Sequence, residues 1–164
     1  MSNYRRMRIE GATYFFTISL ADRGSSVLVD SVDVLRKAYT QTIIEQPVWS
    51  DAFVVLPDHL HAVWTLPEGD ADFSTRWRKI KARFSHALSA TPVRSQSKIA
   101  KGERGIWQRR FWEHLIRDDR DYGNHMEYCW GNPVRHGLVE RVADWPYSSF
   151  HRDVRRGIVP KDWT

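Results

Sequence analysis

A strand-forming stretch with a single interruption constrains the fold of this 164-residue chain more than any other feature. Residues 49–56 and 59–66 are rich in Val, Phe and Trp, which favour strands, and Pro57-Asp58 separates them. So short a connection predicts that the two strands are antiparallel neighbours. Because side chains two apart on a strand share a face, His59 and His61 are expected to lie side by side, with Leu60 on the opposite face.

The rest of the chain supplies further elements on both sides of this stretch. Residues 13–20 predict a strand, because aromatic and β-branched residues dominate them. Apolar residues recur at three- and four-residue spacing over residues 31–46 and again from about residue 72, which predicts two helices. Residues 90–105 are rich in Ser, Pro, Lys and Gly and predict a mobile basic loop. Strand character returns over residues 106–116.

A last helix is expected after this final strand. It begins near a group of acids at residues 118–121, which suit a helix N-terminus, and is expected to end before Pro133. Residues 140–164 show no clear period and predict an irregular tail with a short helix near residues 149–156.

The order β-α-β-β-α-β predicts an α+β fold of the ferredoxin-like, split βαβ type, in which two helices cover one face of an antiparallel sheet. The additional C-terminal helix is expected on the other face, followed by the tail over residues 140–164. Leu60 and Ala62 reach the core only if the histidine pair points to the face that the first two helices leave open. No repeat or linker divides the chain, so residues 1–164 are predicted to form a single domain.

Composition excludes several classes of protein. No apolar run approaches the roughly 20 residues of a membrane helix, and the first residues are polar, so neither a membrane span nor a signal peptide is predicted. Cys129 is the single cysteine, which excludes an internal disulfide and a multi-cysteine zinc module. The protein is therefore expected to be cytoplasmic.

The charge is basic and unevenly distributed. The net charge is +5 and the pI about 9.6, which favour a polyanionic partner. Residues 74–117 hold twelve lysines and arginines but only two acids, with aromatic residues between them. Bases combined with aromatics suit a single nucleic-acid strand, although a solvated basic helix is the alternative. The helical spacing of Trp77 and Phe84 assigns these two aromatics to the core.

Side chains suited to chemistry recur in the last helix. Tyr128 and Asn132 are four residues apart and share a helix face, which His125 joins. Laid across the open sheet face, this helix would bring Tyr128 and the Asn132 amide oxygen to a divalent metal on His59 and His61. Each residue also has an ordinary interpretation: the histidines as polar residues of a solvated sheet face, Tyr128 as a core aromatic, and Asn132 as a helix C-terminal residue.

These residue types suit attack on a phosphodiester. A phenol with a pKa near 10 is a weak nucleophile at neutral pH, and a metal that polarises the phosphate makes its attack feasible. The product is a covalent phosphotyrosine, from which a strand can be rejoined. Mg²⁺ or Mn²⁺ fits such chemistry, and two imidazoles favour Mn²⁺. Tyr122 is a rival nucleophile on a different face of the same helix.

Longer motifs carry a resemblance to a known family. The segment around His59-Leu60-His61, residues 54–70, resembles the His-hydrophobic-His motif of single-tyrosine HUH transposases. Residues 105–117, 128–139 and 144–149 are similar to the REP-associated tyrosine transposase branch. The resemblance extends over essentially the whole chain, as a single HUH transposase-like domain.

This resemblance implies a metal-dependent endonuclease and strand transferase that acts on single-stranded DNA. Its substrates would be REP-type hairpins in bacteria, and its intermediate a covalent 5′-phosphotyrosine. His59 and His61 match the family's metal ligands, Asn132 its third ligand, and Tyr128 its nucleophile. The cofactor implied is Mg²⁺ or Mn²⁺. No protein partner is implied, and the sequence is compatible with a monomer or a dimer.

Basic and aromatic residues outside the motifs are candidates for DNA contact by charge and position alone. They are Tyr4, Arg5, Arg6, Arg78, Lys79, Lys81, Arg83, Arg109 and Arg110. Two other functions are compatible with the same residues: a module that binds structured single-stranded nucleic acid without cleaving it, and a phosphodiesterase that uses water as its nucleophile.

Overall fold

Four antiparallel strands form the sheet that carries the histidine pair. The computed structural model describes residues 6–88 and 105–164, so most of the predicted loop at residues 90–105 lies outside the described residues. The strands are β1 (Thr13–Ser19), β2 (Trp49–Val55), β3 (His59–Thr65) and β4 (Trp112–Leu115), in the order β2-β3-β1-β4. This order is that of the predicted ferredoxin-like sandwich, and β3 lies inside the sheet, paired on both edges.

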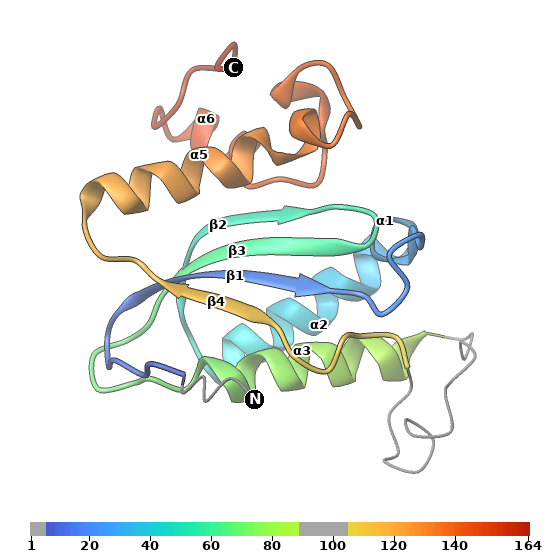
Figure 1. Cartoon of the computed structure of the whole chain (residues 1–164), viewed down its shortest axis with the longest axis vertical. Coiled ribbons are helices and arrows are strands. Elements are labelled where there is room, and N and C mark those ends of the chain that lie inside the picture. The colour runs from blue at the N-terminus through green and yellow to red at the C-terminus, as the bar shows by residue number, and fades with distance from the viewer. Residues whose placement is uncertain (1–5, 89–104) are drawn as a thin grey trace, which may run out of the picture.

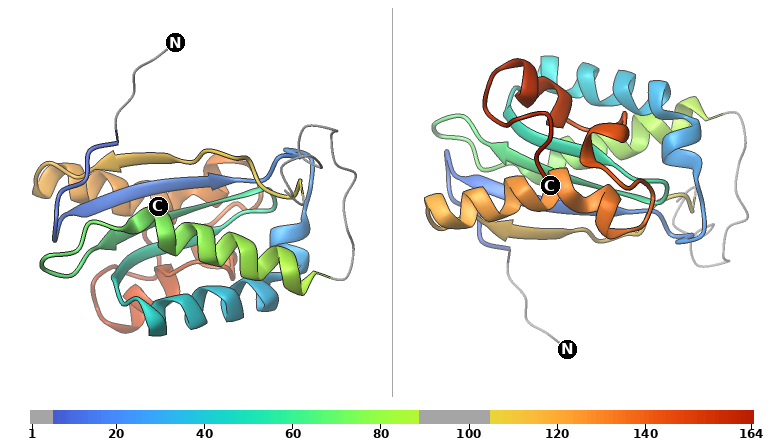
Figure 2. Two further views of the ribbon diagram at one scale, coloured as in Figure 1. Left: turned by 90° about the horizontal axis from the view of Figure 1, so that it is seen from below. Right: turned by 90° about the horizontal axis from the view of Figure 1, so that it is seen from above.

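Two helices cover one face of the sheet, as predicted. They are α2 (Val32–Glu45), preceded by the single turn α1 (Val27–Asp30), and α3 (Phe73–Ala87). Figure 2 shows α2 and α3 side by side beneath the strands. The α3 helix begins where Asp72 accepts a hydrogen bond from the Thr75 N–H at 3.0 Å, as an N-cap aspartate does.

The core between these helices and the sheet is built from alternate strand residues. Leu60 and Ala62 of β3 are fully buried there, as the alternation predicts. The Trp64 and Trp77 rings stack with centroids 4.1 Å apart, and Phe84 is fully buried. The assignment of Trp77 and Phe84 to the core is therefore confirmed.

The last helix, α5 (Asp119–Arg135), covers the other face, which places the two helix layers on opposite sides of the sheet (Figure 1). Met126 and Trp130 of α5 belong to a second core with Phe15 and Val63 of the sheet. Among the described residues, none of the helices combines the length and apolarity needed to cross a bilayer.

The C-terminal tail is irregular apart from the 3₁₀ turn η1 (Val142–Asp144) and α6 (Phe150–Arg155). It packs closely on α5 and β2: the Trp145 indole donates to the Val55 carbonyl at 2.9 Å, and Ser148 forms a bridge with Val54. The tail therefore helps to hold α5 against the sheet.

Two boundary predictions are wrong. The predicted strand at residues 106–116 is reduced to β4, with only an isolated bridge from Trp107 to Leu20 before it. The α5 helix does not end before Pro133 but continues to Arg135, with the His136 N–H donating to the Asn132 carbonyl at 3.0 Å. Asn132 and Pro133 are both buried, and this packing offsets the backbone hydrogen bond that proline cannot make. Tyr128 and Asn132 consequently stay one helical turn apart.

Arg76, one of the basic residues of α3, serves the fold. Its side chain is 1% exposed and donates to the Gln46 and Pro47 carbonyls at the end of α2, each at 2.9 Å. It also forms an ion pair with Asp70 at 2.6 Å, and its hydrogen bonds hold the pKa of Asp70 below its usual value. Arg76 thus ties the start of α3 to the end of α2.

Replacing Arg76 should destabilise the protein strongly. Arg76→Ala removes the donor of the Gln46 and Pro47 carbonyls and the ion-pair partner of Asp70, and we expect a loss of about 3–5 kcal/mol in the free energy of unfolding. Arg78 is exposed on the same helix, so Arg78→Ala should change it by less than about 0.5 kcal/mol. Urea unfolding of the three proteins measures both values, and equal effects of the two substitutions would contradict this role.

Candidate active site

The two histidines of β3 lie beneath α5, in the interior of the molecule. His59 and His61 are 5% and 3% exposed, and their ring centroids are 5.0 Å apart. They share the face of β3 that carries Val63, whereas Leu60 points into the opposite core. The alternation of the strand therefore places both imidazoles together, and α5 covers this face of the sheet, as predicted.

Each imidazole is oriented through its Nδ1 atom. His59 Nδ1–H donates to the Asp58 carboxylate at 2.6 Å, and His61 Nδ1 is hydrogen-bonded to the Thr17 hydroxyl at 2.9 Å. Thr17 reaches His61 because the two residues are paired across β1 and β3. Because both Nδ1 atoms are hydrogen-bonded, the two Nε2 atoms are the ones available to a metal ion. Metal-binding histidines are usually oriented in this way.

A second layer of contacts supports Asp58. Arg23 donates to its carboxylate at 2.9 Å and to the Ser19 hydroxyl at 2.8 Å. Burial raises the pKa of Asp58, but the hydrogen bond to His59 and the charge of Arg23 outweigh it and lower the pKa below its usual value. Asp58 is therefore a carboxylate that fixes the His59 ring.

Burial also sets the charge of the pair. It lowers the pKa of His61 to about 3, with a smaller contribution from neighbouring His59. The pKa of His59 is lowered by burial too, although Asp58 partly opposes this. Both rings are consequently neutral at pH 7, which is the form that coordinates a metal.

Helix α5 brings Tyr128 to this pair. The Tyr128 ring centroid is 5.2 Å from that of His61 and 5.7 Å from that of Phe15. The guanidinium of Arg135 lies over the Tyr128 ring, 4.7 Å from its centroid. A hollow of about 490 Å³ opens beside Tyr128 and is also lined by Gly131, Arg135 and Arg141. The tyrosine is thus half-buried between His61 and an open hollow whose lining carries two arginines and two glutamates.

Two of the predicted metal ligands have buried polar atoms without partners in the described part of the chain. His61 Nε2 and both side-chain atoms of the fully buried Asn132, Oδ1 and Nδ2, have no hydrogen-bond partner among the described residues. An unpaired buried amide is costly, and such groups are rare unless they serve a ligand. Two imidazole nitrogens and an amide oxygen fit a divalent cation, with positions left open for a phosphate.

The rival tyrosine of α5 has a different environment. The Tyr122 hydroxyl donates to the Asp51 carboxylate of β2 at 3.0 Å. Burial, together with the charge of Asp51, raises the pKa of Tyr122 to about 12. This phenol is therefore held protonated and bonded on another face of the helix.

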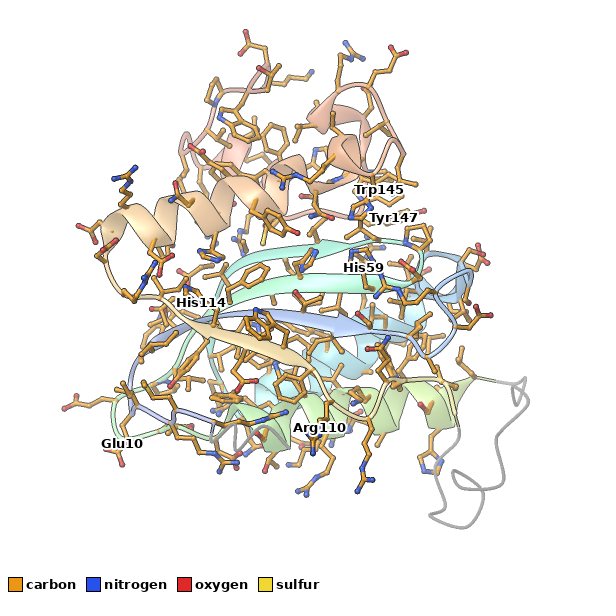
Figure 3. All side chains as sticks on the ribbon, in the orientation of Figure 1. Glu10, His59, Arg110, His114, Trp145 and Tyr147 are labelled. Atoms are coloured by element: carbon orange, nitrogen blue, oxygen red, sulfur yellow. The ribbon has the colours of Figure 1, made fainter. Side chains whose placement is uncertain are left out.

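The candidate DNA-contacting residues that the structure describes lie away from the histidines. Tyr4 and Arg5 are outside the described residues, and Arg6 packs over Phe111, 3.9 Å from the ring centroid. On α3, Lys79 and Arg83 both form ion pairs with Glu45 of α2, on the opposite side of the sheet from the pair. Lys81 is half-buried and donates to the Gln108 carbonyl. Arg78, Arg109 and Arg110 are exposed. Figure 3 shows Arg110 near α3 and His59 near the C-terminal layer.

Several residues at the site are absent from the sequence-based set. Asp58 directly precedes His59, and an acid beside a candidate ligand is a signal that could have been used. Thr17 and Arg23 reach the histidines only through the strand register and the loop after β1, so no local pattern indicates them. His136, whose ring centroid is 5.1 Å from that of His59, requires α5 to continue past Pro133.

Comparison with known proteins shows which family the chain resembles over its whole length. No protein-family model matches the chain. An Escherichia coli REP-associated tyrosine transposase is 49% identical over 163 residues, which are 99% of this chain and 91% of the relative. A Haemophilus influenzae relative assigned to the same group is 50% identical over 164 residues, which are 99% of this chain and 93% of the relative.

A solved structure extends this likeness to three dimensions. It is the REP-associated tyrosine transposase bound to a REP hairpin, and it is 49% identical to this chain with a TM-score of 0.88. The match covers 100% of this chain and 92% of that one. Fold, sequence and relatives define the class as a tyrosine transposase, an enzyme that cleaves and rejoins DNA. Within it, the chain belongs to the family of REP-associated tyrosine transposases.

The buried imidazoles predict a pH-dependent stability. Below pH 6.5 the unfolded chain protonates His61 whereas the folded chain does so only near pH 3, so the unfolded state binds more protons in this interval. The free energy of unfolding should therefore fall as the pH falls, by up to about 1.4 kcal/mol per pH unit from this residue. Urea unfolding in EDTA between pH 7 and 4 should show a shallower decline for His61→Asn, and parallel curves would contradict the assignment.

Proposed function

We propose that this protein nicks and rejoins single-stranded DNA, with Tyr128 as the nucleophile. The observation that carries this proposal is the contact of the Tyr128 ring with His61, whose Nε2 lacks a partner among the described residues. The half-buried ring also borders the hollow through which a phosphate can approach. Tyr122, six residues earlier on α5, donates to Asp51 instead and lines a different hollow.

The reaction exchanges one phosphodiester for another. The Tyr128 oxygen attacks the phosphorus, the bond from phosphorus to the 3′ oxygen breaks, and the phenolic proton is lost while the leaving 3′ oxygen gains one. The DNA 5′ end is then joined to Tyr128 as a phosphotyrosine. Attack by a 3′ hydroxyl on this ester reverses the step and releases the tyrosine, so no external energy source is needed.

We propose that His59, His61 and Asn132 hold a divalent cation, Mg²⁺ or Mn²⁺. When bound, such an ion would polarise the scissile phosphate and stabilise the charge that develops on its oxygens. Asp58 and Thr17 orient the two imidazoles, and Arg23 keeps Asp58 in place. Arg135, stacked on Tyr128, lies where it can stabilise a phenolate or a phosphate beside it.

REP-type hairpins are the substrate that we propose, because a relative of the same fold was solved with one. We propose DNA contact for the basic set, from Tyr4, Arg5 and Arg6 through Arg78, Lys79, Lys81, Arg83, Arg109 and Arg110. The exposed Arg78, Arg109 and Arg110 have the strongest support, since exposed cations can reach phosphates. We further propose that the chain acts as one domain, residues 1–164, in the cytoplasm, where bacterial DNA lies.

Loss of one phenol should abolish the covalent intermediate. Incubation of the protein with Mn²⁺ and a REP-type hairpin oligonucleotide should give a protein–DNA band on a denaturing gel. We expect Tyr128→Phe to lower the amount of this band by at least about 10³-fold, because the nucleophilic oxygen is removed. Tyr122→Phe is the matched control and should retain the band.

Other outcomes distinguish other functions. Cleavage that survives Tyr128→Phe would show water as the nucleophile. Binding of the hairpin without any cleavage by the unaltered protein would identify a non-catalytic binder. Loss of the band in Tyr122→Phe and its retention in Tyr128→Phe would transfer the role to Tyr122.

Because the Asn132 amide is buried and unpaired among the described residues, replacing it should stabilise the fold and weaken metal binding. In EDTA, Asn132→Leu should raise the free energy of unfolding by about 1–2 kcal/mol, since it removes buried polar atoms that lack partners. The same change should remove most of the rise in melting temperature that Mn²⁺ produces in the unaltered protein. Asn124→Leu, at an exposed position of α5, should leave the Mn²⁺ response unchanged. A destabilised Asn132→Leu with a full Mn²⁺ response would exclude Asn132 as a ligand.

A further inference from the structure

A second cluster of metal-ligating side chains lies where α5 begins. It consists of His114 on β4 together with Asp121 and His125, which are one turn apart on α5. In Figure 3 His114 and His59 lie toward opposite ends of the sheet. The cluster belongs to neither the histidine pair of β3 nor the surroundings of Tyr128 described above.

The three side chains already have nearly the spacing of metal ligands. His114 Nε2 is 2.8 Å from Asp121 Oδ2, and His125 Nδ1 is 3.2 Å from Asp121 Oδ1. One ligand atom from each of the three lies within 4.8 Å of the others. Two atoms that share a zinc-like ion at about 2.1 Å each are about 3.4 Å apart in tetrahedral geometry. To admit an ion, the two imidazoles turn slightly away from the carboxylate, and His125 Nδ1 exchanges its 2.8 Å hydrogen bond to the Asp121 backbone carbonyl for the metal.

The carboxylate at the centre is fixed in place. Asp121 Oδ2 accepts from the Arg117 backbone N–H at 3.0 Å, and the Asp121 N–H donates to the carboxylate of Asp118, the N-cap residue of this helix, at 2.8 Å. The Arg117 guanidinium also donates to Asp121, but its side chain is 73% exposed and free to turn toward solvent. The ring planes of His114 and His125 are 22° apart with centroids at 4.7 Å, and both rings are partly open to solvent. A cation can thus enter a site that is built on a strand and a helix.

We propose that His114, Asp121 and His125 bind a second divalent transition-metal ion, of the Zn²⁺ or Co²⁺ type. Two imidazoles and one carboxylate form a ligand set for such ions, with water completing the coordination. The ion cross-links β4 to the first turns of α5. His125 contacts Phe15, whose ring is also stacked on that of His61, and precedes Tyr128 by three residues. An ion bound to these three residues therefore holds α5, the helix that carries Tyr128, in place.

Cobalt titration of the full chain tests this site separately from strand transfer. In the His59→Asn/His61→Asn variant, visible absorption should report one bound Co²⁺. Adding His125→Gln should weaken this binding by about a hundred-fold, because a ligand is lost. Adding His86→Gln instead, an exposed histidine of α3, should leave it unchanged. The unaltered chain should bind one equivalent of Co²⁺ more than its His125→Gln variant. This comparison tests the site even if the His59→Asn/His61→Asn variant fails to fold.

A thermal readout shows whether the ion joins the two elements. Zn²⁺ should raise the melting temperature of the His59→Asn/His61→Asn protein, and His114→Gln should remove that rise while far-ultraviolet circular dichroism stays unchanged. Equal Co²⁺ stoichiometry in the unaltered chain and its His125→Gln variant would overturn the proposal. Binding to the double variant that survives both His114→Gln and His125→Gln would also overturn it.

Discussion

The burial of β3 on both faces is the constraint on which the rest of the structure depends. A strand inside the sheet, with α2 and α3 below it and α5 above, has no solvent to satisfy polar side chains. His59 and His61 are nevertheless placed there, and each needs a partner for Nδ1, from Asp58 and from Thr17. His61 Nε2 and the Asn132 amide lack such partners in the part of the chain that the structure describes. Unpaired buried groups lower the stability of the fold, and such a cost is expected at a functional site.

The α5 helix carries both Asn132, whose buried amide is unpaired among the described residues, and Tyr128. Its apolar residues, Met126 and Trp130 among them, hold it on the sheet, and the C-terminal tail packs against it through Trp163, whose ring centroid is 5.5 Å from that of Trp130. This packing is strong enough for the helix to continue through Pro133, which keeps Asn132 in register with Tyr128. On a helix held in this way, the half-buried Tyr128 borders both the interior histidines and an open hollow.

The sequence predicted much of this arrangement, since alternation in β3 and the order of the elements depend on local patterns. The face shared by His59 and His61 follows from a period of two, and the spacing of Tyr128 and Asn132 from the helix repeat. Thr17 could not be assigned because it meets His61 only through strand register across 44 positions of the chain. The end of α5 was misplaced because the local preference of Pro133 was outweighed by tertiary burial. Charge alone could not reveal that Lys79 and Arg83 are paired with Glu45.

The central claim is that the interior histidines and Asn132 form one metal centre next to Tyr128. A crystal structure of the full chain soaked with Mn²⁺, with anomalous scattering recorded to locate manganese, tests it most directly. We expect an anomalous peak bonded to Nε2 of both His59 and His61 and to the Asn132 oxygen, with the Tyr128 hydroxyl facing it. A peak that excludes Asn132, or a Tyr128 hydroxyl turned away from manganese bound at the histidines, would contradict the account.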